Sequence, residues 1–538
     1  MTQLHDAHFE RELRSTEATA NKAVTLTLAA IAILLILVAV INFINFAFAE
    51  IPFRIKNINT RKVLGESRGS LIGRQLIHAG LIALVAFAIA ALIMHVAAGT
   101  SWASHVSDSL ALKDNIAILC RMMGIILFCA IVAGIFPALY STAQPAALVL
   151  KGSYATSVRG KTLRNFMVSL QFFFSFILIL MALFVGVQTR FMLNRDMGFS
   201  QEYILQVGCG STAGRQHEAL EAKLLQNPAI KEVTFADNCI VNDIFMNWSR
   251  TDKEGLQFEM DVLPVADDFV DFFGLQILEG RDFLPSDSQS ESGAYIANET
   301  FMQGYPAYHI GSQISEPNAK EKGDLVGVVK DFHFRSLQHA MRPLVLYNLG
   351  KNSTRGFQVL YVKTIPGGDF KALSQSIKEA VCSFAPMMDP NQVDIVFLDE
   401  WIQSMYDEEQ SLGQLITVAS FVALLIALIG IIGLVFFETQ FLRKEIAVRR
   451  VNGGTVGDIL KMINKKYLIM AGVSFVIATP VAYWLMTAWR EGFAYQSPVP
   501  VWIFIVALLA VTAITLAVVT LQSWRTANAN PVESLKNE

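Results

Sequence analysis

The sequence has little charge and few cysteines for its length. Only 17% of its 538 residues are charged, while 53% are hydrophobic, whereas a soluble chain carries about 25% charged residues. The net charge of -3 offers no excess of basic groups for nucleic-acid binding, so no nucleic-acid partner is expected. Five cysteines without a CxxC pair or a Cys/His cluster predict neither a zinc site nor a disulfide scaffold.

The sequence also lacks the motifs of nucleotide-binding and hydrolytic enzymes. No G-x-x-x-x-G-K-[ST] phosphate-binding loop occurs, so the chain is not itself an ATPase. Gly65–Gly69 reads GESRG and matches the G-x-S-x-G pattern of hydrolases, but that pattern acts only between a strand and a helix. Here it follows a long apolar run. We therefore expect no catalytic site, metal or cofactor.

What the sequence does contain is seven apolar runs, each long enough to cross a bilayer at roughly 20 residues as a helix. They are Ala23–Ala49, Leu76–Ala98, Ile116–Tyr140, Phe166–Val187, Leu415–Phe437, Tyr467–Met486 and Trp502–Leu521. A backbone inside lipid must satisfy its own hydrogen bonds, so helices are expected. The first run is not a signal peptide, because it is too long and no cleavage site follows it.

The loops between these runs predict the orientation. Lys and Arg favour the cytoplasmic side of short loops, and they concentrate after the first, third and fifth runs and in the C-terminal tail. The opposite short loops hold only Lys113 and Arg490. This places the N-terminus and residues 190–410 outside the cytoplasm and the C-terminus inside, in a multi-pass protein of the cytoplasmic (inner) membrane.

The chain also contains an internal repeat with an offset of 388 positions, the distance from Ile58 to Ile446. Under this offset the basic loops correspond: Lys56, Arg61, Lys62, Gly65 and Gly69 fall on Lys444, Arg449, Arg450, Gly453 and Gly457. Each loop is followed by two further helices and a segment with proline before Leu-Lys, QPAALVLKG at 144–152 and NPVESLKNE at 530–538. A repeat of supersecondary units indicates a duplicated membrane domain.

The second unit is longer than the first, because it begins with an additional helix and a large non-membrane segment. The leader of the first unit, residues 1–21, is similar to 398–414, which leads out of that segment. Either the first unit has lost its first helix and outer domain by shortening at the N-terminus, the interpretation we favour, or an odd number of helices is native.

Residues 190–410 predict a mixed α/β domain. Five stretches rich in β-branched and aromatic residues indicate strands, at 203–209, 230–236, 258–265, 324–334 and 357–364. Apolar residues at three-and-four spacing predict helices at 214–227 and 369–385. One disulfide among Cys209, Cys239 and Cys382 or three free thiols both remain open at this point.

Taken together, these segments resemble the FtsX-like, MacB-type ABC transporter permeases. RKVLGESRGSLI at 61–72, the two Pro-to-Leu-Lys segments and LRNFMVSLQFFFSFILI at 163–179 are similar to the membrane domains of that family. GLQILEGRDF at 274–283, YIANETF at 295–301 and GVVKDFHFRSLQHAMRPLVL at 327–346 are similar to its periplasmic core domain. Glu445 matches the family's glutamate, but its counterpart is Asn57, so the first turn is expected to couple less well.

The resemblance implies an α-helical membrane protein with two FtsX-like repeats and an inserted α/β extracytoplasmic domain. The expected divisions are a leader at 1–21, a first permease unit at 22–152, a linker and helix at 153–189, a MacB-like periplasmic core domain at 190–410 and a second permease unit at 411–538.

As a function, the resemblance implies a non-enzymatic permease subunit for mechanotransmission, which couples ATP hydrolysis in a separate ATPase subunit to movement of the outer domain. The cargo would be a peptide, drug or lipoprotein. The alternative is a transmembrane signalling protein that activates an envelope enzyme such as a cell-wall hydrolase. Expected partners are the ATPase, a second permease chain (identical or related), the bilayer and a periplasmic protein or peptide.

The residues expected to contact the ATPase lie in the two basic turns. They are Lys56, Arg61, Lys62, Gly65 and Arg68 in the first turn and Lys444, Glu445, Arg449, Arg450 and Gly453 in the second. In each, a helix leaves the membrane, ends at a glycine that tolerates the left-handed conformation, and is predicted to continue as a short amphipathic helix. Simple anchoring to lipid phosphates would accept any basic residues, whereas the repeated order of residues favours a specific contact.

Overall fold

The computed structural model describes residues 22–98, 111–143, 158–251, 257–314, 322–351, 353 and 355–528. The chain divides into two compact units. A membrane unit comprises 1–185, 412–487 and 499–538, and an outer unit comprises 186–411 with 488–498. The leader and both Pro-to-Leu-Lys segments lie outside the described residues.

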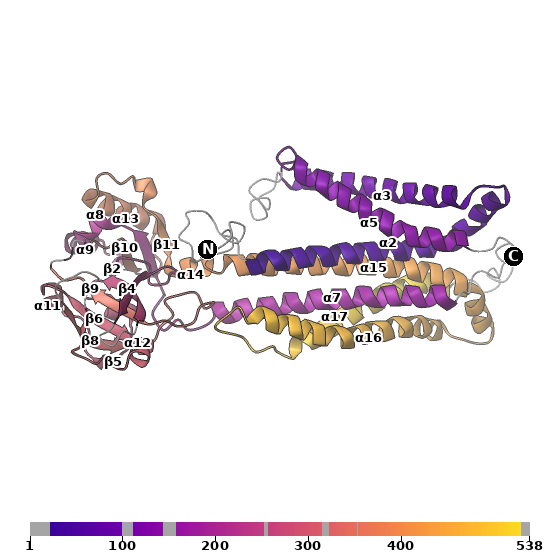
Figure 1. Ribbon diagram of the computed structural model, residues 1–538. Helices are drawn as coiled ribbons and strands as arrows, with labels where there is room; N and C mark the ends of the chain where they lie inside the picture. The colour runs from indigo at the N-terminus through magenta and orange to yellow at the C-terminus, as the bar shows by residue number, and fades with distance from the viewer. Residues whose placement is uncertain are drawn as a thin grey trace. The chain divides into compact units, whose positions relative to one another are not determined.

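Seven long helices carry the apolar runs (Figure 1). They are α2 (Lys22–Val63), α3 (Arg68–Ala97), α5 (Ile116–Ala143), α7 (Val158–Leu193), α15 (Asp407–Val451), α16 (Val456–Arg490) and α17 (Trp502–Ala527). All seven are long and apolar enough to span a membrane, which confirms the predicted fold class. The predicted short helices after the two turns are wrong: α3 and α16 begin directly after the turns and continue through the span, because no proline separates the basic segment from the apolar one.

The two repeats meet where α2 crosses α15. A Cβ atom on Gly430 of α15 would collide with the side-chain oxygen of Asn42 on α2, and one on Gly433 would lie 2.7 Å from the Phe46 ring. Small residues allow such close approach of membrane helices. On its other side α15 contacts α7, where a Cβ on Gly413 would lie 3.2 Å from Val185.

Helix α7 also packs against α16. The Ser474 hydroxyl donates to the backbone oxygen of Ser169 at 2.8 Å, and the rings of Phe176 and Phe475 meet edge to face at 5.2 Å. The spans of α7 and α15 are the most buried of the seven, while those of α3 and α5 are the least buried. The second repeat is therefore more tightly packed than the first.

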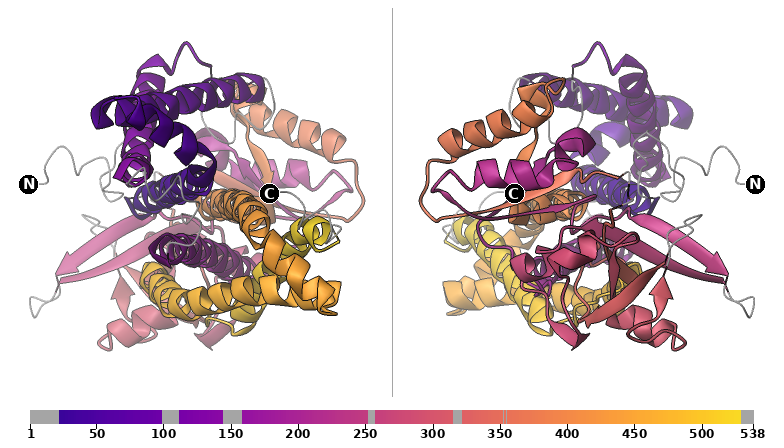
Figure 2. Two further views of the ribbon diagram at one scale, coloured as in Figure 1. Left: turned by 90° about the vertical axis from the view of Figure 1, so that its right-hand side faces the viewer. Right: turned by 90° about the vertical axis from the view of Figure 1, so that its left-hand side faces the viewer.

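The outer unit is built on a mixed sheet (Figure 2). Its strand order is β11-β1-β10-β2-β4-β9-β6-β8-β5, with β3 paired to β4 and β7 to β8. The strands are β1 (Ile204–Gly208), β2 (Ile230–Ala236), β3 (Met246–Thr251), β4 (Gln257–Val265), β5 (Ile277–Gly280), β6 (Ala294–Asn298), β7 (Gln313–Ile314), β8 (Gly323–Val329), β9 (Leu344–Asn348), β10 (Val359–Thr364) and β11 (Ile395–Phe397). The five predicted strands are present, although those predicted at 203–209, 324–334 and 357–364 are shorter in the structure.

Short helices cover this sheet. They are α8 (Gly210–Gly214), α9 (His217–Leu224), α10 (Phe269–Phe273), α11 (Pro285–Ser288), α12 (Glu299–Gly304), α13 (Phe370–Phe384) and α14 (Leu398–Ser404). Both predicted helices of this segment are present, as α9 and α13. Leu220, Leu373 and Ile377 on these helices pack on one part of the sheet. Strands β2 and β4 share the single pair Ala236 and Val265, so the sheet is narrowly joined at its middle.

A short segment far along the chain completes the outer unit. Residues 488–498, between α16 and α17, belong to it. The Gln188 amide donates to the Tyr495 carbonyl at 2.9 Å and accepts from the Ser497 backbone N–H at 2.8 Å. The Arg195 guanidinium lies 4.6 Å from the centre of the Tyr495 ring, and His333 meets the same ring edge to face. Cys209, Cys239 and Cys382 are free thiols.

Candidate functional site: two basic turns

The first turn closes the cytoplasmic end predicted for α2. Gly65 has a φ of +93°, which a residue with a side chain rarely adopts. The Gly65 N–H donates to the Lys62 carbonyl at 3.2 Å, and the Glu66 N–H donates to the Arg61 carbonyl at 3.0 Å. These two nested bonds form a Schellman motif, which satisfies carbonyls that a helix end leaves without a partner.

The second turn has the same construction 388 positions later. Gly453 has a φ of +90°. Its N–H donates to the Arg450 carbonyl at 3.1 Å, and the Gly454 N–H donates to the Arg449 carbonyl at 2.8 Å. The helix end, the left-handed glycine and both acceptors thus fall on corresponding residues, so the repeat extends to backbone hydrogen bonding.

The following helix is also capped at corresponding positions. The Ser67 hydroxyl accepts from the Ser70 N–H at 3.3 Å. Thr455 accepts from the Asp458 N–H at 3.2 Å, and the Asp458 carboxylate accepts from the Thr455 N–H at 3.0 Å. This reciprocal pair is a capping box. Ser67 therefore has a structural explanation as a helix cap, and the T-x-x-D pattern at 455 was a readable signal that the sequence analysis missed.

The turns differ in how their arginines are held. Arg449 pairs with Glu445 one helical turn earlier at 2.7 Å, with 54% and 50% of the two side chains exposed. In the first turn, Arg61 donates instead to the Asn57 side-chain oxygen at 2.9 Å. The Asn-for-Glu difference therefore removes the ion pair within the helix, and Arg61 instead lies 3.8 Å from the carboxylate of Glu66, which follows the glycine.

The first turn also forms hydrogen bonds with the C-terminal end of α5. The Lys62 ammonium donates to the Thr142 carbonyl at 3.2 Å, and Arg68 contacts the Thr142 hydroxyl at 3.4 Å. Cations are favoured near a helix C-terminus, so α5 fixes two of the five predicted residues. Thr142 was not among the predictions.

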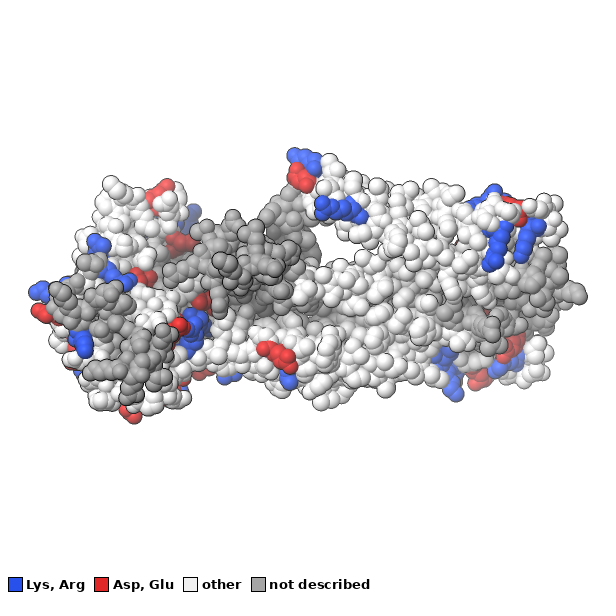
Figure 3. All heavy atoms as spheres, in the orientation of Figure 1, with Lys and Arg blue, Asp and Glu red and all other residues white. Residues whose placement is uncertain are grey.

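The predicted site residues thus form two separate turns. The side chains of Lys56 and Lys444 lie outside the description, while their backbones lie in α2 and α15. Arg450 is partly exposed. Figure 3 shows Lys and Arg gathered at the end of the membrane unit that carries the turns, and uncharged residues along the helices. Among the described residues, no group of three or more His, Cys, Asp or Glu could hold a metal ion.

Because Lys and Arg gather at the turns, these can offer cationic, hydrogen-bonding surfaces to an acidic partner.

Comparisons with known proteins bear on the membrane unit. Residues 29–146 and 417–531 match the model of the FtsX-like permease C-terminal family, so each repeat gives a match of its own. Each matched region includes one basic turn. A comparison of the sequence with curated proteins gave no match.

Solved structures are similar to part of the chain. The periplasmic region of MacB from Actinobacillus actinomycetemcomitans is 14% identical over 40% of this chain and 97% of that chain, with a TM-score of 0.28. The extracellular domain of the ABC-type transporter YknZ from Gram-positive bacteria is 11% identical over 36% of this chain and 99% of that chain, with a TM-score of 0.27. Scores this low carry no conclusion about function.

Proposed function

We propose that this chain, which matches the FtsX-like permease family over both repeats, is driven by a separate ATPase subunit that contacts its two basic turns. The chain is then the membrane-spanning, non-enzymatic subunit of an ABC transporter in the inner membrane. Both turns lie in the cytoplasm, and the outer unit lies on the opposite side of the membrane.

The observation that carries this proposal is the repeated construction of the turns. In both turns an arginine at the helix end precedes a left-handed glycine, and in both the next spanning helix begins with a side-chain cap. Topology alone requires only positive charge on that side. A common shape at corresponding positions is what two equivalent clefts of a dimeric ATPase would select.

Helix α16 gives the second turn a direct mechanical path to the outer unit. The helix starts at Val456, three residues after Gly453, and ends at Arg490. The last three residues of the helix already belong to 488–498, whose Tyr495 and Ser497 are hydrogen-bonded to Gln188 within the outer unit. A displacement of the turn along α16 would therefore reach the outer domain through continuous backbone.

The movement of the outer unit is proposed to act, outside the membrane, on a peptide, drug or lipoprotein. A second permease chain, identical or related, completes the complex. The alternative is that the outer unit activates an envelope enzyme such as a cell-wall hydrolase, with the same ATPase contacts.

The proposal is tested by affinity purification of the full-length protein in mild detergent, followed by mass spectrometry. We expect a nucleotide-binding subunit in near-equal amount. An envelope hydrolase recovered with it would favour the signalling alternative. Failure to recover any ATPase from membranes that contain the intact complex would contradict both versions.

A further inference from the structure

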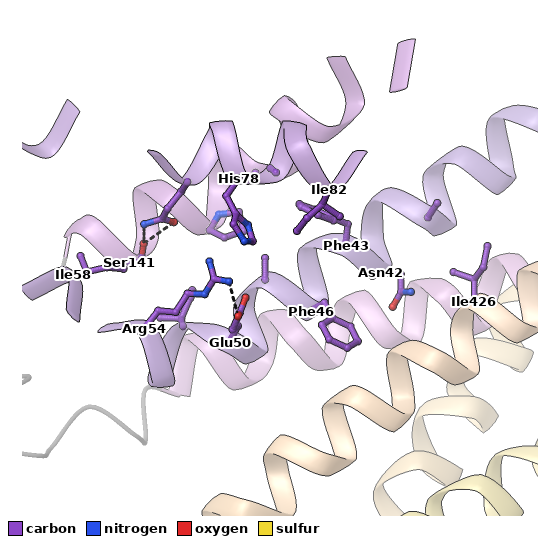
Figure 4. A pocket seen from close by; sticks show the side chains of 17 residues that line it. Asn42, Phe43, Phe46, Glu50, Arg54, Ile58, His78, Ile82, Ser141 and Ile426 are labelled. Atoms are coloured by element: carbon purple, nitrogen blue, oxygen red, sulfur yellow. Dashed lines mark hydrogen bonds and ion pairs between the residues drawn. The ribbon is translucent and has the colours of Figure 1, made fainter. Parts of the chain in front are cut away.

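The membrane unit contains a cavity of about 470 Å³ between α2, α3 and α5, which Ile426 of α15 also lines (Figure 4). One end is lined by the apolar side chains of Phe43, Phe46 and Ile82 together with the amide of Asn42. Its other end is polar: Glu50 and Arg54 form an ion pair at 2.6 Å with 43% and 41% of their side chains exposed. Figure 4 shows His78 directed into the same space.

At the corresponding place in the second repeat, side chains of α16 instead reach across to α15. Glu438 corresponds to Glu50 and Lys466 to His78 under the 388-residue offset. The Lys466 ammonium reaches both oxygens of Glu438 at 2.8 Å, and the hydroxyl of the fully buried Tyr467 donates to one of them at 3.2 Å. Tyr467 corresponds to Ala79, which is too small to reach across.

The cavity lies across a boundary between apolar and polar surroundings. The apolar span of α2 runs from Leu28 to Phe48. Phe43 and Phe46 are within this span, whereas Glu50 and Arg54 follow its end by about half a helical turn and just under two turns. The polar end therefore lies at the depth of lipid headgroups, and the aromatic wall lies at the depth of acyl chains.

We propose that this cavity binds one phospholipid of the surrounding bilayer. The phosphate contacts Arg54 and His78, and an acyl chain lies along Phe43, Phe46 and Ile82. A guanidinium has five donors, so Arg54 can hold a phosphate oxygen while it keeps its bond to Glu50. The volume lies within the 300–1,000 Å³ range of small-ligand sites, which suits a headgroup with part of one chain.

The test uses the full-length protein reconstituted into vesicles of phosphatidylethanolamine and phosphatidylglycerol, without any cargo, then released for native mass spectrometry. We expect one phospholipid to remain bound after the others dissociate. Arg54→Gln and His78→Gln should each lower its occupancy about fivefold, the effect of one basic contact. Ile82→Trp, which fills the apolar end and changes no charge, should also remove it.

Arg74→Gln is the matched control, because Arg74 is 62% exposed and binds Glu66 at the first turn, outside the cavity. It should leave the retained lipid unchanged. An equal loss with Arg74→Gln, or retention with Ile82→Trp, would overturn the proposal in favour of general attraction to a basic surface. Loss of all lipid from the wild-type protein under the same conditions would overturn it as well.

Discussion

Asn42 and Gly430 contact each other where α2 crosses α15, and each is the repeat counterpart of the other. A contact between corresponding residues is the mark of a two-fold interface, here between two halves of one chain. The Asn42 side-chain oxygen lies buried there without a hydrogen-bond donor among the described residues. The absence of a side chain at Gly430 is what permits this approach.

Gly430→Val should therefore loosen the crossing of the two repeats. The added methyl groups must displace Asn42, and overpacking of this kind costs about 1–3 kcal/mol. Thermal unfolding in detergent measures the loss. Gly472→Val is the control, because a Cβ at Gly472 would meet nothing within 4 Å. If the two variants unfold at the same temperature, α2 and α15 are not held by this contact.

The ion pair between Lys466 and Glu438 should matter more to stability than the pair between Arg54 and Glu50. Only 24% and 19% of the Lys466 and Glu438 side chains are exposed, so Lys466→Gln leaves a largely buried carboxylate without its cation. We expect a loss of about 1–3 kcal/mol, less than for a fully buried pair because some exposure remains. Arg54→Gln should lose at most about 1 kcal/mol, as judged by unfolding of both variants in one detergent. The reverse order would contradict this account.

The outer unit should lose stability as the pH rises towards neutrality. Burial, with the nearby carboxylates of Asp268, Asp267 and Glu218, raises the pKa of Glu221 from 4.5 to about 7. Between these two values the folded state holds a proton that the unfolded chain has released, so the free energy of unfolding falls as pH rises through this window. Burial likewise raises the pKa of Asp268 to about 6.

Glu221→Gln should therefore stabilise the protein at about pH 8 and have no effect below pH 4.5. We expect a gain of about 1 kcal/mol, reduced from the full linkage value because Glu221 is partly exposed to solvent. Glu232→Gln is an opposite control, since the hydrogen bond from Lys363 lowers the pKa of Glu232 and stabilises its charged form. Thermal unfolding at both pH values checks the pair, and a gain that is equal at both would exclude titration of Glu221 as its cause.

Loss of the Gln188 amide should release 488–498 from the outer unit. Gln188→Leu removes two hydrogen bonds to this segment and leaves buried partners unsatisfied, at a cost of about 1–3 kcal/mol each. Hydrogen exchange should rise at 488–498 before the rest of the outer unit. Gln358→Leu, whose side-chain bond to Asp237 is exposed, should leave the exchange of this segment unchanged. If hydrogen exchange at 488–498 is unchanged in the Gln188 variant, Gln188 does not hold this segment, and the proposed mechanical connection through α16 is contradicted.

The sequence predicted those features that depend on residues close together along the chain. The spans follow from apolar runs, and the left-handed conformations of Gly65 and Gly453 follow from glycine after a basic helix end. The cavity could not be predicted in this way, because it depends on how α3 and α5 lie against α2. The correspondence of Glu50 with Glu438 could be read from the repeat and would have drawn attention to Glu50.

The order of strands was beyond prediction for a related reason. Strand β4 pairs in parallel with β9, and β6 pairs in parallel with β8. These pairings join distant segments, and short apolar runs do not specify which of several strands becomes the neighbour.

The central claim is that the basic turns bind an ATPase subunit, and charge reversal tests it most directly. The double variants Arg449→Glu/Arg450→Glu and Arg61→Glu/Lys62→Glu should both insert into the membrane, and the ATPase that co-purifies with each should be measured against the wild-type protein. We predict that reversal at the second turn abolishes recovery of the ATPase. Reversal at the first turn should reduce it less, because Asn57 stands there in place of the glutamate that pairs with Arg449. Undiminished recovery with the Arg449/Arg450 variant would contradict the account.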